Sequence, residues 1–224
     1  MKNGHLHFPF IMGGIALACF LAVVLLVQTV VQPPWGRVLV LLLPALILFG
    51  IGIFGRAGIL DAGKTTALTA GSSAVLFLLS VCYVLLLMIW MATTTTTDTK
   101  YYARAYRQIS ERGSVTACFP GSIPEEATDV EFRYNPQFLQ GGEEFRLSYH
   151  ATEAGLLDQL GKLPAAAQWS GTNEDWYRMH NQSPRDPGLI RYQLFGEGFS
   201  NHGEEACVLV DPSVGRIEFC YSKW

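Results

Sequence analysis

The chain has 224 residues, half of them hydrophobic, but its 16 basic and 19 acidic residues are distributed unevenly. Up to Ala92 there are four basic residues and one acidic residue, whereas from Thr93 onward there are 12 basic and 18 acidic residues. The first part therefore has the composition of a membrane region and the second that of one acidic globular domain, which argues against a nucleic-acid partner because phosphate binding needs clustered lysine and arginine.

Three apolar runs without charged residues are each long enough to cross a bilayer as a helix, at about residues 11–31, 38–54 and 67–92. The first run is longer than the apolar core of a signal peptide and continues into Gln32-Pro33-Pro34-Trp35. We interpret it as a retained span, with a cleaved leader as the alternative. No ionisable residue lies at the centre of a run, which weakens a transporter function. We therefore expect a three-helix anchor in the lipid bilayer.

The second run contains one proline and three glycines that predict its shape. Pro44 removes a backbone donor and predicts a kink. Gly50, Gly52 and Gly55 predict close packing against a neighbouring helix.

The connection between the second and third runs, GILDAGKT, matches the phosphate-loop pattern GxxxxGK[ST] letter for letter. In that motif Gly58, Gly63, Lys64 and Thr65 would cradle nucleotide phosphates at the start of a helix that follows a strand. Here apolar membrane runs lie on both sides. We therefore interpret the match as a decoy, a basic interhelical loop with Thr65 or Thr66 near a helix start, and expect neither a nucleotide nor another cofactor.

The soluble part begins with a threonine-rich linker and a juxtamembrane helix at residues 93–112. The apolar face of this helix consists of Tyr102, Ala105, Tyr106 and Ile109, and we expect it to lie against the domain at residues 113–224.

The soluble domain shows strand alternation at Val130–Tyr134 and Phe145–Tyr149, which predicts two antiparallel strands. Thr152 predicts the cap of a short helix that ends between Gly161 and Pro164. Residues 165–188 read mostly as loop with one helical turn, and Arg191–Phe195 reads as a strand. The whole chain is thus predicted to be a transmembrane α-helical anchor followed by a C-terminal α+β domain with an antiparallel sheet.

The chain closes with a predicted hairpin in which a four-residue loop sets Asp211 opposite Arg216. This register places Cys207 opposite Cys220. The two residues either form a cross-strand disulfide, which would indicate an oxidising compartment, or remain thiols with the register shifted by one residue. Cys118 is predicted to be a buried residue rather than a nucleophile.

Three segments of the soluble domain carry a family resemblance. The run FPGSIPEEATDVEFRYNPQFLQGGEEFRLSY (119–149), the later Asn201-His202-Gly203 and the terminal hairpin ending in Trp224 resemble a group of uncharacterised bacterial membrane-associated proteins, seen mainly in Firmicutes. The resemblance covers most of the soluble domain and little of the membrane region. It implies a bacterial source and an extracytoplasmic fold, and it implies no activity.

The membrane orientation follows from the basic residues that flank the spans. The short loops favour a cytoplasmic N-terminus, with Arg56 and Lys64 inside and Arg37 outside. The four basic residues between 100 and 112 lean the other way, although long translocated domains follow the rule poorly. We expect a multi-pass membrane protein with a cytoplasmic N-terminus and an extracytoplasmic C-terminal domain.

Three functions are compatible with this architecture. The first is a membrane-anchored interaction or sensing domain. Its candidate surface is aromatic and polar and consists of Tyr134, Phe138, Trp169, Trp176, Tyr177 and His202. The alternative, which the usual burial of aromatic residues favours, is that these side chains belong to the core. The second function is an accessory subunit that binds a protein partner in the membrane through small residues of the spans.

The third function is an enzyme with a histidine–glutamate site. His150, His180 and His202, with Glu204 and Glu205, are the residues suited to acid–base or metal chemistry. They lack the spacing of a known metal or catalytic motif, so we expect no catalytic residue and no metal site.

Overall fold

The chain divides into two units, Met1–Met91 and Ala92–Trp224. The structure is a computed structural model that describes residues 4–110, 118–137, 142–183, 186–196 and 203–223. The division lies at the point where the composition of the sequence changes.

The first unit contains three stretches that are long and apolar enough to cross a membrane, His7–Val27, Trp35–Arg56 and Ala62–Thr93. The helices of this unit are α1 (Gly4–Val27), α2 (Trp35–Val38), the 3-10 helix η1 (Leu39–Leu42), α3 (Leu43–Arg56) and α4 (Ala62–Thr93). The prediction of three transmembrane helices is confirmed, with different bounds. The first helix ends at Val27 rather than residue 31, because Thr29 and Val30 already form turn hydrogen bonds.

Pro44 lies in the first turn of α3, directly after the 3-10 segment. A proline is tolerated there because the first-turn N–H groups have no intrahelical acceptor. Two of the three glycines pack as predicted. A Cβ at Gly52 would meet the Phe10 ring at 2.7 Å and one at Gly55 would meet Thr65 at 2.9 Å, whereas Gly50 has open space beside it.

Polar contacts join the second half of α4 to Arg37 of α2. The Tyr83 hydroxyl donates to the backbone oxygen of Arg37 at 2.9 Å. The Arg37 guanidinium in turn lies 3.8 Å from the centre of the Trp90 ring. Arginine and tryptophan at the end of a span are typical of a membrane interface.

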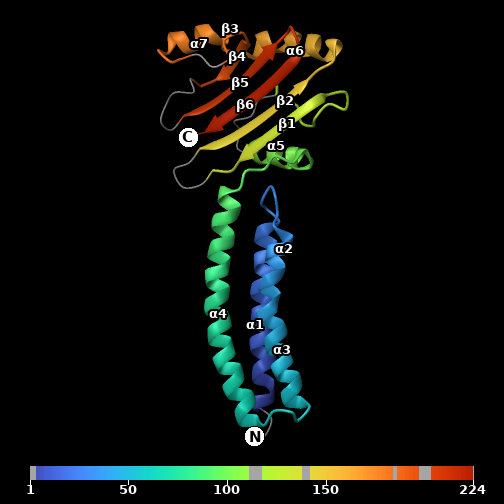
Figure 1. The fold of residues 1–224 in the computed structure, drawn as a ribbon, viewed down its shortest axis with the longest axis vertical. Coiled ribbons are helices and arrows are strands. Elements are labelled where there is room, and N and C mark those ends of the chain that lie inside the picture. Colours follow the sequence, from blue (N-terminus) through green and yellow to red (C-terminus); the bar gives the residue numbers. More distant parts are fainter. Residues whose placement is uncertain (1–3, 111–117, 138–141, 184–185, 197–202, 224) are drawn as a thin grey trace. The chain divides into compact units, whose positions relative to one another are not determined.

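The second unit is built on a six-stranded antiparallel sheet with the strand order β1-β2-β6-β5-β4-β3 (Figure 1). The strands are β1 (Thr128–Asn135), β2 (Glu143–His150), β3 (Trp169–Thr172), β4 (Ile190–Phe195), β5 (Glu204–Asp211) and β6 (Arg216–Lys223). The helices are η2 (Thr99–Tyr101), α5 (Tyr102–Ser110), α6 (Glu153–Ala166) and α7 (Asn173–Met179). The predicted α+β class and antiparallel sheet are therefore confirmed.

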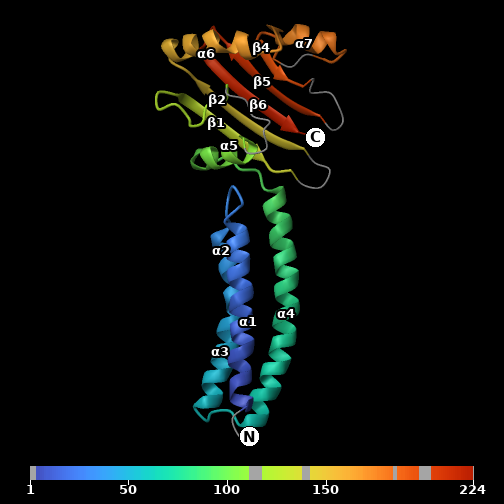
Figure 2. The ribbon, with the colours of Figure 1, turned by 180° about the vertical axis from the view of Figure 1, so that it is seen from behind.

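One face of the sheet forms the core of the domain, and helix α5 closes it at β1 and β2 (Figure 2). The Tyr102 ring of α5 lies 5.5 Å from both Phe132 and Phe145. Phe119 covers the middle strands, with its ring 5.4 Å from Phe219. We call this side of the sheet the apolar face. Its side chains alternate with those that point to the other side, as an antiparallel sheet with one buried face requires.

The stretch between β2 and β4 differs from its prediction. Helix α6 begins with Thr152 as its cap, as expected, but continues past Gly161 to Ala166. Pro164 lies near the helix end, and Leu163 is fully buried, so packing outweighs the helix-breaking signal. The stretch read mostly as loop with one helical turn contains strand β3, which was not predicted, and helix α7. The side chain of Thr172 caps α7 by accepting from the Asp175 N–H at 3.1 Å.

The predicted terminal hairpin is confirmed. Asp211 pairs with Arg216 and Cys207 pairs with Cys220, in the expected register. Gly215 adopts a φ of 71°, which suits glycine in the turn.

Candidate binding face of the soluble domain

The side of the sheet opposite the core carries charged and polar residues, and we call it the polar face. The strand register places one residue of each strand in a row across it, in the order Arg133, Arg146, Cys220, Cys207, Gln193 and Trp169. The next row consists of Glu131, Ser148, Glu218, Leu209, Arg191 and Gly171. Basic and acidic side chains therefore alternate across neighbouring rows.

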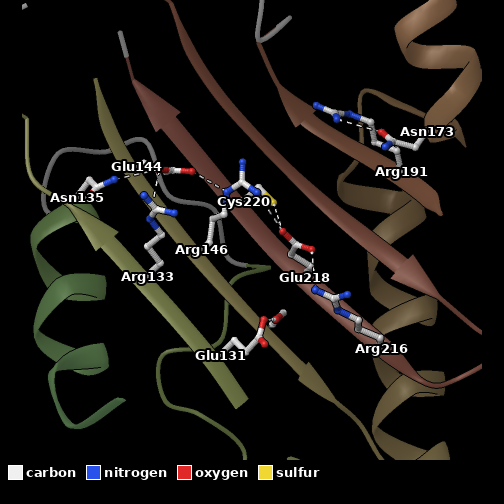
Figure 3. Close-up of polar contacts among 11 residues, drawn as sticks. Glu131, Arg133, Asn135, Glu144, Arg146, Asn173, Arg191, Arg216, Glu218 and Cys220 are labelled. Carbon is white, nitrogen blue, oxygen red and sulfur yellow. Dashed lines mark hydrogen bonds and ion pairs between the residues drawn. The ribbon is translucent and has the colours of Figure 1, made fainter. Parts of the chain in front are cut away.

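Arg146 is the centre of an ion-pair network on this face (Figure 3). Its Nε lies 2.7 Å from Glu144, and its Nη1 donates to Glu218 at 3.5 Å. Arg133 lies directly opposite Arg146 on β1, and its Nε is 3.9 Å from the same Glu144. Two like charges directly opposite each other destabilise a sheet. The shared carboxylate offsets this repulsion, and Asn135 orients the carboxylate with a 3.1 Å hydrogen bond.

Both arginines keep access to solvent. The side chain of Arg133 is 56% exposed and that of Arg146 is 50% exposed. Exposed ion pairs contribute little to stability, typically about 0–1 kcal/mol. These ion pairs can therefore be exchanged for pairs with another molecule at little cost in the stability of the domain.

Arg191 has the opposite character, because it is buried and its side chain is only 5% exposed. Its Nε donates to Gln193 at 2.7 Å, and its Nη1 donates to Asn173 at 3.2 Å. Its Nη2 forms an ion pair with Glu205, and its guanidinium lies 4.9 Å from the centre of the Trp176 ring. Arg191 therefore fastens α7 to β4 and β5 at one end of the polar face.

The polar face is hollowed between Arg146 and Arg191. A cavity of about 130 Å³ is lined by residues that include Arg146, Arg191, Cys207, Glu218 and Cys220. A wider hollow of about 590 Å³ is lined in part by Glu131, Arg133, Arg146 and Arg216. Arg146 and Glu218 line both, so they lie where the two hollows meet.

The two opposed cysteines are free thiols in the structure. Cys207 is 3% exposed, whereas Cys220 is half-buried and its thiol contacts a Glu218 carboxylate oxygen at 3.5 Å. The contact with Cys207, burial and the nearby Glu218 raise the pKa of Cys220, while Arg146 opposes the rise. The predicted disulfide stays a prediction, and Cys118 is half-buried.

The histidines that suggested an enzyme have separate neighbours. His150 Nδ1 lies 3.1 Å from Asp129, and His180 Nδ1 lies 2.8 Å from the backbone oxygen of Trp176. His202 lies outside the described residues. Glu204 pairs with Lys223 and Glu205 with Arg191. Within the described ranges, no group of three histidine, cysteine, aspartate or glutamate residues could hold a metal ion.

The aromatic residues proposed as an interaction surface are partly interior. Tyr134 is 1% exposed and donates its hydroxyl to Glu143 at 2.7 Å. Trp176 is 5% exposed and packs 5.1 Å from Trp169. Tyr177 is half-buried beside the smaller cavity, while Phe138 lies outside the described residues. Trp169 and Tyr177 remain at the polar face. Of the two buried residues, Trp176 packs on Trp169 and Arg191, whereas Tyr134 belongs to the apolar face beside α5.

The phosphate-loop match connects two helices, α3 and α4, rather than a strand and a helix. Asp61 caps α4 by accepting from the Lys64 N–H at 2.8 Å, and its carboxylate lies 3.2 Å from the Lys64 ammonium. The buried Thr65 hydroxyl donates to the backbone oxygen of Asp61 at 2.9 Å. Gly58 adopts a φ of 74° and Gly63 lies in the first turn of α4. The polar groups that would bind a phosphate are thus engaged in starting a helix, which Asp61 caps, and Thr65 and Thr66 lie near its start as predicted.

Comparisons of the chain with protein-family models, with curated proteins and with solved structures found no match. The resemblance based on residues 119–149 therefore stays a prediction. What is known of the site comes from its own geometry.

Proposed function

We propose that the protein is a membrane-anchored binding protein whose polar face engages a partner with both positive and negative charges. The observation that supports this most directly is the half-exposed Arg146 between Glu144 and Glu218, at the junction of two hollows. A face on which arginine and glutamate alternate suits a peptide segment or a protein surface better than a polyanion.

The division between fixed and adaptable residues is a second support. Arg191 is buried and fully engaged, so it keeps its end of the face rigid. Arg133 and Arg146 are exposed and can exchange their present partners for those of a ligand. A rigid frame around a few adaptable charges is an arrangement that limits the ordering cost of binding.

We further propose that this domain lies on the outer face of the cell membrane and that the N-terminus is cytoplasmic. The charges of the two short loops support this orientation, with Arg56 and Lys64 on the inner side. An impermeant thiol reagent should label intact cells at an introduced Leu157→Cys, made in a chain whose native cysteines are replaced by serine. Labelling only after lysis would reverse the proposed orientation.

A photo-crosslinking side chain placed at position 131 tests the binding function in the membrane of the native cell. Glu131 is exposed on the polar face, and Ser148 is its hydrogen-bond partner at 3.4 Å. The matched control is the same side chain at Leu157, which is 62% exposed on α6. We expect a discrete adduct from position 131 that is absent from position 157. Identical adduct patterns from the two positions would contradict the proposal.

An accessory subunit of a membrane complex is the second candidate. An apolar cavity of about 280 Å³ lies among α1, α3 and α4, and the buried Ser73 hydroxyl on its wall has no hydrogen-bond partner. A side chain from another membrane helix would fill this cavity and satisfy Ser73. Purification in mild detergent should then yield a stoichiometric second protein that Ser73→Leu removes.

A further inference from the structure

We propose that Cys207 and Cys220 form a thiol–disulfide exchange site, in which an external disulfide oxidises the pair to an intrachain bridge that changes the charge network of the polar face. The effect of the bridge on binding rests on the proposed function of this face. The exchange reaction itself does not.

The position of the pair carries the first part of the inference. The two residues are directly opposite on neighbouring strands, and both line the cavity of about 130 Å³. Opposed positions bring two side chains close enough for a bridge without rearranging the strands. The cavity gives a small disulfide a route to the thiols, which structural cysteines in a closed core do not have.

The unequal exposure of the two residues sets the order of events. Cys220 is half-buried, whereas Cys207 is 3% exposed, so an external disulfide reaches Cys220 first. Because the pKa of Cys220 is raised, its thiol must first lose its proton to the alkaline solution. The resulting thiolate attacks one sulfur of the external disulfide, forming a mixed disulfide and releasing one thiolate. The Cys207 thiolate then attacks the Cys220 sulfur and releases the second thiolate. The protons of the two cysteine thiols end on the two released thiols, so the external disulfide is reduced and the pair is oxidised.

The consequence for the polar face passes through Glu218. One oxygen of this carboxylate contacts the Cys220 thiol at 3.5 Å and the Arg146 Nη1 at the same distance. The other oxygen accepts from Arg216 at 3.4 Å. A bridged Cys220 has no thiol hydrogen to donate, so Glu218 loses that donor. Its carboxylate is then left with Arg146 and Arg216, which also line the wider hollow, so the ion pairs of the polar face are expected to rearrange.

The first experiment measures the exchange chemistry on the full-length protein in detergent. The protein is incubated with glutathione disulfide at mildly alkaline pH, alkylated and examined by mass spectrometry. We expect a bridge between Cys207 and Cys220 that added thiol reverses. Cys207→Ser should accumulate a mixed disulfide on Cys220, and Cys220→Ser should react on the order of tenfold more slowly because the remaining thiol is buried.

The matched control is Cys118→Ser, which should bridge at the wild-type rate. A wild-type protein that forms no 207–220 bridge would overturn the proposal. So would equal reaction rates of the two single variants, because the order of attack depends on the exposure of Cys220.

The second experiment measures the coupling to binding with the photo-crosslinker at position 131. Oxidised and reduced wild-type protein should differ several-fold in adduct yield. The double variant Cys207→Ser/Cys220→Ser, which has no thiol at the pair, should give the same adduct yield under both conditions. A bridge that leaves the adduct yield unchanged would overturn the coupling while the binding function stands. Absence of any adduct in either state, together with a normal bridge, would sink the binding function and leave the exchange site in place.

Discussion

The two faces of the six-stranded sheet differ in what their side chains contact. On the apolar face Phe145, Phe219 and Ile217 are fully buried, and ring contacts of about 5 to 6 Å connect strands to α5 and Phe119. On the polar face Arg133 and Arg146 are half-exposed and share a carboxylate. The same strands and register serve both faces. Stability is thus concentrated on the apolar face and around the buried Arg191, and the part of the polar face around Arg133 and Arg146 is left free to vary its contacts.

The largest expected effect is on the apolar face. Phe219→Ala removes a fully buried ring that packs on Phe119 and Tyr149, so it should lower the free energy of unfolding of the domain by about 3–5 kcal/mol. Chemical denaturation followed by near-ultraviolet circular dichroism measures the change. Leu157→Ala, at an exposed position, is the control. A loss below about 1 kcal/mol at Phe219 would mean that the apolar face is not the core.

Two arginines on the polar face sharpen the comparison. Arg191→Met leaves Glu205 and Asn173 without their buried partner and should cost about 3–5 kcal/mol of stability. Arg146→Met removes a half-exposed ion pair and should cost about 0–1 kcal/mol. The denaturation midpoints of the two variants give the comparison directly. Equal losses of stability in the two variants would contradict the conclusion that Arg191 holds α7 rigidly against the sheet while Arg146 can change its partners.

Most of the architecture could be predicted from the sequence because it depends on local patterns. Uninterrupted apolar runs indicate membrane helices, and alternation at residues 130–134 and 145–149 indicates strands. The final hairpin followed from its turn residues, and its register then followed from the loop length. The sequence also placed the two cysteines opposite each other.

The stretch from Trp169 to Met179 could not be read correctly because tertiary contacts decide it. Strand β3 is an edge strand that depends on pairing with β4, and α7 depends on Arg191 and the Trp169–Trp176 contact. A local signal for α7 was present, since Thr172 followed three residues later by Asp175 is typical of a helix start. The ion-pair network of the polar face could have been predicted from the charged residues that alternate with apolar positions. These residues are Glu131 and Arg133 on β1 and Arg146 on β2. The buried role of Arg191 could not, because nothing in its own strand indicates that α7 covers it.

A smaller effect should appear at alkaline pH on the apolar face. Burial, and secondarily the charge of Glu126, raises the pKa of Tyr149 to about 12. The unfolded phenol ionises near pH 10, so its stabilising contribution is complete below that pH and is lost as the pH rises toward 12. Tyr149→Phe should reduce the alkaline loss of stability in this window. Denaturation curves at a series of pH values measure it, and an unchanged profile in the variant would contradict the burial of this phenol.

The smallest expected effect is at the exposed hairpin turn. The Ser213 hydroxyl donates to Asp211 at 2.5 Å and its N–H at 3.0 Å, which lowers the pKa of Asp211. This contribution to stability is present above the ordinary pKa of the carboxyl and is lost as the pH falls through the lowered value. Ser213→Ala should return the pKa of Asp211 toward its ordinary value, as measured by carboxyl NMR titration. A pKa that does not move would assign the shift to the backbone N–H groups of Ser213 and Val214 and to Arg216 instead.

The division of the sheet into a stabilising face and a binding face is tested most directly by Arg146→Met in the protein that carries the crosslinker at position 131. Adduct yield in the native membrane and the denaturation midpoint of the purified protein are measured on the same variant. The predicted result is an adduct yield that falls several-fold while the midpoint stays close to that of the unsubstituted protein. An adduct yield that is unchanged, with the fold intact, would contradict a binding role for this face.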